Sequence, residues 1–236
     1  MSVYACSDLH GCLEQWLMIK KFLKENDRVF VLGDCADRGP DGWRTLKSVL
    51  AEPRATLLKG NHEDMLLKVL EEEEEGWPAE CAFWLLSRNG GTPTYDAWQE
   101  DGRDFKWISV LKHLPNHATY VNKEGKTIWL SHSGCPPLRN KHTGALVIGE
   151  RSAIWDRDHI TENWHCDENI ICVHGHTPVP YLMEELGELP FGYEGEFEPG
   201  AFWYCDNHKV CIDNASFLTG DVVLLDLDTW EEHIFF

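Results

Sequence analysis

Five short apolar runs in this sequence are each followed at once by residues whose side chains can bind a metal ion. The polar segments are residues 7–11, 33–39, 60–63, 131–134 and 174–178. In α/β proteins, binding sites form in the crevice beyond the carboxyl ends of the strands, so segments that are distant in sequence converge there. The spacing therefore predicts one composite site.

The candidate ligands in these segments offer carboxylate, amide and imidazole donors but no thiolate. They are Asp8, His10, Asp34, Asn61, His132 and His176. This donor set suits divalent ions such as Mn²⁺, with iron or zinc as alternatives, and disfavours a structural thiolate site. One ion that keeps open positions cannot use so many groups, so two ions are expected. Asp34 follows the middle one of the first three apolar runs and is the best candidate for a bridging carboxylate.

The combined motifs resemble one known family of enzymes. They read Asp-x-His-Gly at residues 8–11, Gly-Asp-x-x-Asp-Arg-Gly at 33–39, Gly-Asn-His-Glu at 60–63, a histidine at 132 and Gly-His at 175–176. In this order they are similar to the calcineurin-like metallophosphoesterase superfamily, over about three quarters of the chain. The Asp-Arg-Gly and Asn-His-Glu endings resemble its phosphoprotein phosphatase branch, in particular small bacterial and phage serine/threonine phosphatases.

The resemblance implies both a fold and a role for each matching residue. The fold is an α/β domain of two sheets, an α/β/β/α sandwich with a helical insertion. Asp8, His10 and Asp34 match the ligands of the first metal ion, and Asp34, Asn61, His132 and His176 match those of the second. His62 matches the general acid, Asp37 its partner, and Arg38 and Arg157 the phosphate-binding arginines, Arg157 through a Trp-x-Arg stretch at 155–157.

These parts support hydrolysis of a phosphomonoester. Two divalent ions roughly 3.5–4 Å apart lower the pKa of a bridging water, and the resulting hydroxide attacks phosphorus in line. An alkoxide leaving group needs a proton, which an imidazolium held charged by a carboxylate can donate. We therefore expect a serine/threonine protein phosphatase that acts on a phosphorylated protein or a small phosphoester.

Two other functions stay open at this point. A dinucleoside tetraphosphatase with symmetrical cleavage shares the same blocks, but there the second block is expected to read Ala-Arg-Gly and the third to end in Asp instead of Glu63. A catalytically dead phosphopeptide-binding module is the other alternative, although every expected ligand position is filled.

Several single residues also have more than one interpretation. Glu63 reads as an acidic residue in the first turn of a helix, where it complements the helix dipole. His174 either contacts the metals or supports the ligands from behind. Arg151 is an alternative to Arg157, and the Asn-Gly-Gly stretch at 89–91 is either part of the site or a turn that ends a helix.

The elements that must position these residues follow from hydrophobic periodicity. Three short strands are expected, at 3–6, 28–32 and 55–58. A helical pattern follows each of them: the first at 13–23, the second after residue 41, and the third ending at residue 70. This alternation predicts parallel strands with helical crossovers. A helical insertion is expected at about 77–115, then a hairpin at 117–121 and 126–130 and a strand at 170–173. Antiparallel strands are expected at 209–212, 222–227 and 233–236, all within a single domain spanning 1–236.

Composition limits the remaining possibilities. The chain has 236 residues, 43% of them hydrophobic and 26% charged, as in folded globular proteins. A net charge of −19 opposes nucleic-acid binding, and the acidic stretches at 71–75 and about 184–200 are expected to be a solvated helix end and a surface loop. Nine cysteines, an odd number without a Cys-x-x-Cys pair, and no signal peptide or membrane span favour the cytoplasm.

Overall fold

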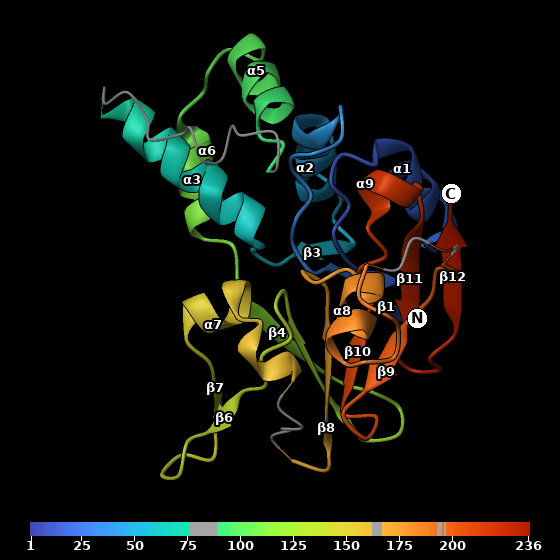
Figure 1. Ribbon diagram of the computed structural model, residues 1–236. Coiled ribbons are helices and arrows are strands. Elements are labelled where there is room, and N and C mark those ends of the chain that lie inside the picture. The colour runs from blue at the N-terminus through green and yellow to red at the C-terminus, as the bar shows by residue number, and fades with distance from the viewer. Residues whose placement is uncertain (76–88, 162–166, 193–194, 196) are drawn as a thin grey trace.

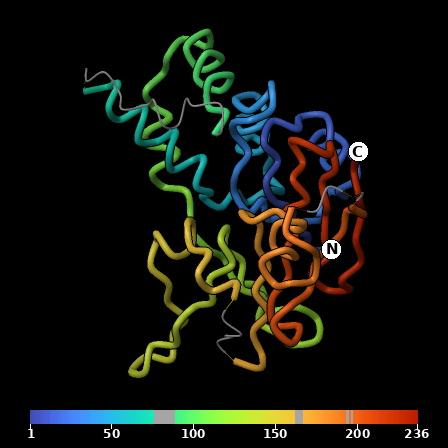
Figure 2. The backbone as a smooth tube through the Cα atoms, in the orientation of Figure 1, coloured from blue at the N-terminus to red at the C-terminus, as the bar shows by residue number. Residues whose placement is uncertain are grey.

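Two five-stranded sheets lie face to face, with helices on their outer sides (Figure 1). The structure is a computed structural model that describes residues 1–75, 89–161, 167–192, 195 and 197–236. The two ends of the chain lie on the same side of the molecule, because the first and the last strands belong to one sheet (Figure 2).

The first sheet combines the N-terminal parallel strands with two strands from the C-terminus. Its order is β12 (Glu232–Phe235), β11 (Val222–Asp226), β1 (Val3–Cys6), β2 (Arg28–Val31) and β3 (Ala55–Leu57). β1 pairs with β2, and β2 with β3, in parallel, while β11 runs antiparallel to β1. The crossovers are the helices α1 (Leu13–Phe22) and α2 (Gly42–Leu50). The alternating pattern of strands and helices predicted this part of the fold.

The second sheet holds the strands from the middle of the chain. Its order is β4 (His117–Val121), β5 (Thr127–Ser131), β8 (Ile170–His174), β10 (Lys209–Cys211) and β9 (Phe202–Tyr204). The expectation of purely antiparallel tail strands was wrong for β10, which is antiparallel to β9 but parallel to β8. The reason is that the chain leaves β8, passes through α8 (Val179–Glu185) and returns through β9 before it forms β10.

The hydrophobic core has layers on both sides of each sheet. Along β1 the side chains alternate, so that Val3 and Ala5 face the second sheet while Tyr4 and Cys6 pack beneath the helices. The layer between the sheets also contains Leu130 of β5, and the outer face of the second sheet packs against α8. This arrangement confirms the predicted α/β/β/α sandwich.

The remaining helices cap the site region and the outer faces. They are α3 (Asn61–Glu74), α5 (Thr92–Glu100), α6 (Lys106–Lys112), α7 (Glu150–Trp155), the short 3₁₀ helix η1 (Asp158–Ile160) and α9 (Ser216–Thr219), and a small hairpin is formed by β6 (Leu138–Arg139) and β7 (Leu146–Val147). In the predicted insertion at 77–115, α5 packs beside α2 and α6 beside α3. Residues 77–88 of that prediction lie outside the described part of the chain.

The two acidic stretches have different structures. Residues 71–74 form the last turn of α3, where Glu71 pairs with Lys112 at 3.1 Å and Glu73 pairs with Arg103. The predicted acidic loop at 184–200 needs a correction, because Glu184 and Glu185 belong to α8. Within the described residues, no helix is both long enough and apolar enough to span a membrane.

Candidate active site

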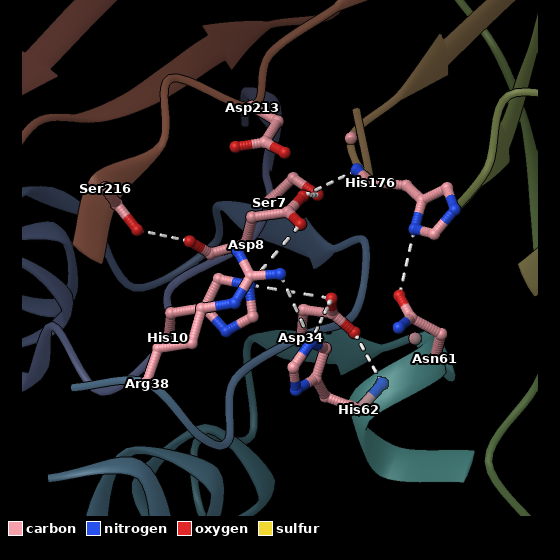
Figure 3. Close-up of polar contacts among 12 residues, drawn as sticks. Ser7, Asp8, His10, Asp34, Arg38, Asn61, His62, His176, Asp213 and Ser216 are labelled. Carbon is pink, nitrogen blue, oxygen red and sulfur yellow. Dashed lines mark hydrogen bonds and ion pairs between the residues drawn. The ribbon is translucent and has the colours of Figure 1, made fainter. Parts of the chain in front are cut away.

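The six candidate ligands meet at one place although five separate segments carry them. Each follows the carboxyl end of a strand, namely β1, β2, β3, β5 or β8, as the sequence predicted. All six side chains are buried, and all of them except His132 are labelled in Figure 3. They are Asp8, His10, Asp34, Asn61, His132 and His176. Convergence of this kind is what a composite metal site requires.

Asp34 lies at the centre of the cluster. Its Oδ2 atom is 3.4 Å from Nε2 of His132, 3.6 Å from Nε2 of His10 and 3.8 Å from Nε2 of His62. Burial raises the pKa of Asp34, but the surrounding histidines, above all His132, more than offset this and hold the pKa well below its usual value. An ionised carboxylate between two groups of histidines is the geometry that a bridging ligand needs.

The potential metal ligands fall into two groups that share Asp34. One contains His10, Asp34 and His62, and the other Asp34, His132 and His176, with the donor atoms of each group within 4.8 Å of one another. The sequence assigned Asp8 rather than His62 to the first group. Asp8 lies beside it, with Oδ1 3.9 Å from Nε2 of His10, and its Oδ2 accepts a hydrogen bond from the backbone N–H of His176.

The histidine tautomers leave nitrogen lone pairs inside the cluster. Nδ1 of His10 donates to the carbonyl of Ala36 at 2.9 Å, so its Nε2 carries the lone pair. Within the described residues, Nε2 of His10 and Nε2 of His176 are buried and have no hydrogen-bond partner. Burial also holds the pKa of both histidines well below the ordinary value, which keeps the rings neutral, the form that binds metal.

The electrostatic environment of the second ligand group, which contains Asp34, His132 and His176, also favours a bound cation. The Oδ1 atom of Asn61 lies 2.9 Å from both Nε2 of His132 and Nδ1 of His176. Burial lowers the pKa of His132, yet the nearby carboxylates, led by Asp34, raise it to about 9. The oxygens of Asn61 and Asp34 around the His132 ring thus stabilise a positive charge. A bound divalent ion would supply that charge in place of the proton on the ring. The residues fit a pair of divalent ions by donor type, tautomer and charge.

A buried histidine–aspartate pair adjoins the ligand cluster. Nδ1 of His62 donates to Oδ2 of Asp37 at 2.7 Å, and both side chains are almost fully buried. Burial lowers the pKa of His62, but the carboxylates of Asp34 and Asp37 raise it above the ordinary value. The Nε2 atom of His62 faces Asp34 and lies 3.4 Å from Nη2 of Arg38. The pair therefore presents one nitrogen toward the candidate site and stabilises the charged ring.

The two candidate phosphate-binding arginines come from two segments that are far apart in the sequence. Arg38 belongs to the loop after β2 and lies beside His62. Arg157 precedes η1, and its guanidinium donates to the carbonyl of His176 at 3.1 Å and to Oγ1 of Thr177 at 3.2 Å. Arg157 and Arg151 line one shared surface depression, and it is Arg157 that donates hydrogen bonds to the His176 loop.

The backbone of the site is held in an unusual conformation. Six non-glycine residues of the site have φ between 41° and 71°, in the left-handed region: Asp8, His10, Asp34, Asp37, Arg38 and His176. Such conformations cost on the order of 1–3 kcal/mol each and persist only where surrounding contacts enforce them. The site loops must therefore be tied together by other residues.

Glu63 provides such ties, and its interpretation as a simple first-turn acid was incomplete. Its carboxylate accepts hydrogen bonds from the backbone N–H groups of Asp34 at 2.7 Å, Cys35 at 2.8 Å and Gly60 at 3.0 Å. The two loops approach so closely that a Cβ atom on Gly60 would lie 2.1 Å from Oδ1 of Asp34. Glu63 thus joins the loop after β2 to the start of α3.

We expect Glu63→Gln to lower the free energy of unfolding by about 2–4 kcal/mol, because an amide NH₂ group would face N–H donors that now share a carboxylate. The measurement is urea unfolding of the metal-free protein. Glu74→Gln, an exposed change near the end of the same helix, is the matched control. Equal unfolding midpoints for the two variants would contradict the role given to Glu63.

His174 lies behind the site rather than in either ligand group. Its buried ring donates from Nδ1 to the carbonyl of Gly175 at 3.0 Å and accepts at Nε2 from the hydroxyl of Tyr204 at 2.9 Å. A ring with both nitrogens engaged in this way supports the loop that carries His176.

Sequence reasoning missed the segment that follows β10. Asp213 is buried beside Asp8, where burial and then the charge of Asp8 raise its pKa well above the ordinary value. Ser216 donates to the carbonyl of Asp8, and Phe217 packs against His10. The signal was present, since Asp213 and Asn214 directly follow the apolar run at 210–212 in the same way as the ligand segments follow theirs.

Two facing sheets with candidate metal ligands at the strand ends define a metallophosphoesterase type of domain. Comparison with known proteins agrees, because residues 1–212 match the model of the calcineurin-like phosphoesterase family. The chain belongs to this family.

Curated relatives carry two different names. Serine/threonine-protein phosphatase 2 of Escherichia coli K12 is 26% identical over 165 residues, which cover 68% of this chain and 70% of the relative. A symmetrical bis(5'-nucleosyl)-tetraphosphatase of Aliivibrio fischeri is 34% identical over 202 residues, covering 81% of this chain and 68% of the relative. The chain spans about half the length of several other relatives with the latter name.

A solved structure shares the fold over almost the whole chain. The crystal structure of a candidate diadenosine tetraphosphatase superposes with a TM-score of 0.59 at 15% sequence identity, covering 98% of this chain and 91% of the other. At this identity the likeness concerns the fold.

Proposed function

We propose that this phosphoesterase is a metal-dependent phosphomonoesterase of the serine/threonine protein phosphatase type. The observation that carries the proposal is the buried pair of His62 and Asp37, whose Nδ1 and Oδ2 atoms lie 2.7 Å apart. A serine or threonine alkoxide is strongly basic and leaves only with a proton. Cleavage of a polyphosphate releases a phosphate oxygen that is already stable as an anion, so it needs such a donor much less.

Each part of the site has a role in this proposal. Bound divalent ions, held by the six candidate ligands with Asp34 between the two groups, would supply an activated water and polarise the phosphoryl oxygens. Arg38 and Arg157 bind equatorial phosphoryl oxygens through planar, paired N–H donors and stabilise the charge that develops in the transition state.

Proton transfer falls to His62. Asp37 fixes the tautomer by accepting from Nδ1, so the proton available for transfer is on Nε2, the nitrogen that faces Arg38. The leaving oxygen takes this proton as its bond to phosphorus breaks. The raised pKa of His62 agrees with a ring that begins the reaction protonated.

The overall charge supports the same substrate class. A net charge of −19 repels a free tetraphosphate before it reaches the site, whereas a phosphorylated segment of a protein can carry basic residues beside its phosphate. Mn²⁺ is the proposed metal because oxygen and imidazole donors dominate the site, and iron or zinc would also fit.

Symmetrical dinucleoside tetraphosphatase is the second candidate function. It is supported by the relative of that name, which is 34% identical and matches 81% of this chain. Because the chain spans only about half of several such relatives, the activity of the whole protein is a proposal in either case.

An assay of the Mn²⁺-loaded protein on two substrates separates these functions. We expect kcat/KM for phosphoserine and phosphothreonine peptides to exceed that for diadenosine tetraphosphate, because the leaving alkoxide uses the proton donor and the charge field repels the nucleotide. Release of inorganic phosphate and formation of ADP are the two readouts. Turnover of the nucleotide alone would favour the dinucleoside tetraphosphatase. Binding of the phosphopeptide without turnover of either substrate would favour a binding module.

A further inference from the structure

An aromatic ring that belongs to none of the motifs covers the guanidinium of Arg38. Cζ of Arg38 lies 4.5 Å from the centroid of the Phe217 ring, a separation typical of a cation–π contact. The same ring makes an edge contact with His10, with centroids 5.6 Å apart and planes at 79°. Phe217 belongs to α9, which follows β10 of the second sheet and begins beside Asp8.

The ring explains how Arg38 tolerates partial burial. Among the described residues, Nε of Arg38 is buried without a hydrogen-bond partner. An arginine nitrogen removed from water in this way needs compensation, which the negative face of an aromatic ring provides. The terminal Nη2 atom keeps its contact with His62 at 3.4 Å. The aromatic ring therefore lies over a guanidinium whose Nε is shielded from water, while Nη2 lies beside the proposed proton donor.

The main chain of Arg38 is fixed from the other side. Its N–H donates to the carbonyl of Gly90 at 2.8 Å, and its own φ is 62°. A Cβ atom on Gly90 would lie 2.7 Å from Cα of Arg38, so only glycine allows this approach. The Asn-Gly-Gly stretch thus contacts the backbone of Arg38, while Phe217 contacts the side chain of Arg38.

The position of Phe217 is itself tied to the ligand loops. The hydroxyl of the preceding Ser216 donates to the carbonyl of Asp8 (Figure 3). The N–H of Ala215 donates to Oδ1 of Asp213 at 2.9 Å, and Ala215 adopts a φ of 55°. These contacts fix the start of α9 against the loop after β1. The ring consequently has a defined place relative to the candidate ligands.

We propose that Phe217 is a positioning residue, which holds the guanidinium of Arg38 in the orientation that receives a phosphoryl group. The inference rests on the phosphate-binding role proposed above for Arg38. Stacking restricts a side chain that would otherwise sample many rotamers, so less conformational entropy is lost when phosphate binds. Phe217 thereby acts on affinity for the phosphoryl group without touching it.

Kinetics of four proteins test this inference. Wild type is compared with Phe217→Leu, which removes the ring, Phe217→Tyr, which keeps it, and Leu218→Ala, a control at the adjacent residue, which is 75% exposed. We expect Phe217→Leu to raise the inhibition constant of inorganic phosphate, and to lower kcat/KM, by about threefold to thirtyfold. Phe217→Tyr and Leu218→Ala should stay close to wild type.

Nuclear magnetic resonance of the metal-free protein gives a readout that does not need turnover. In wild type, the Nε–H proton of Arg38 should be shifted upfield by the ring current and exchange slowly, and Arg38→Lys assigns it. Phe217→Leu should abolish the shift and require more inorganic phosphate to perturb the surrounding signals, whereas Leu218→Ala should change neither.

The outcomes distinguish failure of the role given to Phe217 from failure of the proposed phosphomonoesterase function. An unshifted Nε–H signal in wild type, or equal phosphate affinity in Phe217→Leu and wild type, overturns the role of Phe217. If wild type hydrolyses no phosphomonoester yet phosphate titration still distinguishes Phe217→Leu, the proposed function fails and the positioning role stands.

Discussion

Replacing His62 with asparagine should lower kcat/KM for a phosphoserine peptide by about 10²–10⁴-fold, the usual contribution of a positioned general acid. The same change should cost much less with an aryl phosphate, because a phenolate is a far better leaving group than an alkoxide. The variant keeps the N–H group of residue 62 that donates to Oδ1 of Asp34 at 3.0 Å, so the backbone of the site is preserved.

Paired assays of the two substrates on the Mn²⁺-loaded protein measure this difference. His142→Asn, an exposed change distant from the site in sequence, controls for loss of a histidine elsewhere. Asp37→Asn should reproduce the selective loss in weaker form, because the ring of His62 then loses the carboxylate that stabilises its charge. Equal losses on peptide and aryl phosphate would remove the proton-donor role and leave His62 among the ligands of the first group.

The geometry of His62 is compatible with both of these roles. Nε2 of His62 is 3.8 Å from Oδ2 of Asp34, close enough for the residue to join a ligand group with His10. Its Nδ1 nevertheless donates to Asp37, which belongs to neither ligand group. A nitrogen backed by a carboxylate suits both a proton donor and a metal ligand, so only chemistry with two leaving groups distinguishes them.

Strand ends were the part of the site that sequence could predict. Asp8, Asp34 and Asn61 each follow an apolar run, and parallel pairing of β1, β2 and β3 brings such residues to one edge of a sheet. The second sheet adds His132 and His176 by the same rule, since β5 and β8 are also parallel. The local hydrophobic pattern and parallel pairing through helical crossovers are enough for this prediction.

Interactions between loops were beyond the reach of the sequence pattern. Glu63 is adjacent to ligands in sequence, but its main partners lie 28 and 29 residues earlier, at Cys35 and Asp34. Its role depends on how closely two loops approach, which no local periodicity encodes. Phe217 is a comparable case, because it contacts Arg38 only after α9, which follows β10, packs against the loop after β1.

Short elements were missed for a related physical reason. Helices α7 and α9 have six and four residues, too few to show a helical repeat, and helices of that length are unstable alone. Tertiary contacts hold them, for example the indole N–H of Trp155, which donates to Oδ2 of Asp64 at 3.1 Å. Where a segment owes its structure to its neighbours, its own sequence carries little signal.

Asp34→Asn should have the largest effect of any single change, because Asp34 is shared by both ligand groups. In the proposed two-ion site, loss of the shared carboxylate would remove negative charge from between the ions, a contribution of several kcal/mol, so kcat/KM should fall by about 10³-fold or more. The asparagine of this variant can still accept the backbone N–H of His62 through Oδ1. The loss of kcat/KM in this variant therefore results from the missing negative charge and not from loss of the hydrogen bond between residues 34 and 62.

Metal content and activity together check this expectation. After removal of bound ions with a chelator and addition of Mn²⁺, wild type should bind two ions per chain by elemental analysis and titration calorimetry, and Asp34→Asn fewer than two. Asp41→Asn, at a partly exposed carboxylate outside both ligand groups, should retain both ions. Two ions bound with unchanged affinity by Asp34→Asn would mean that the shared carboxylate does not bridge them, and the two ligand groups would then act as separate sites.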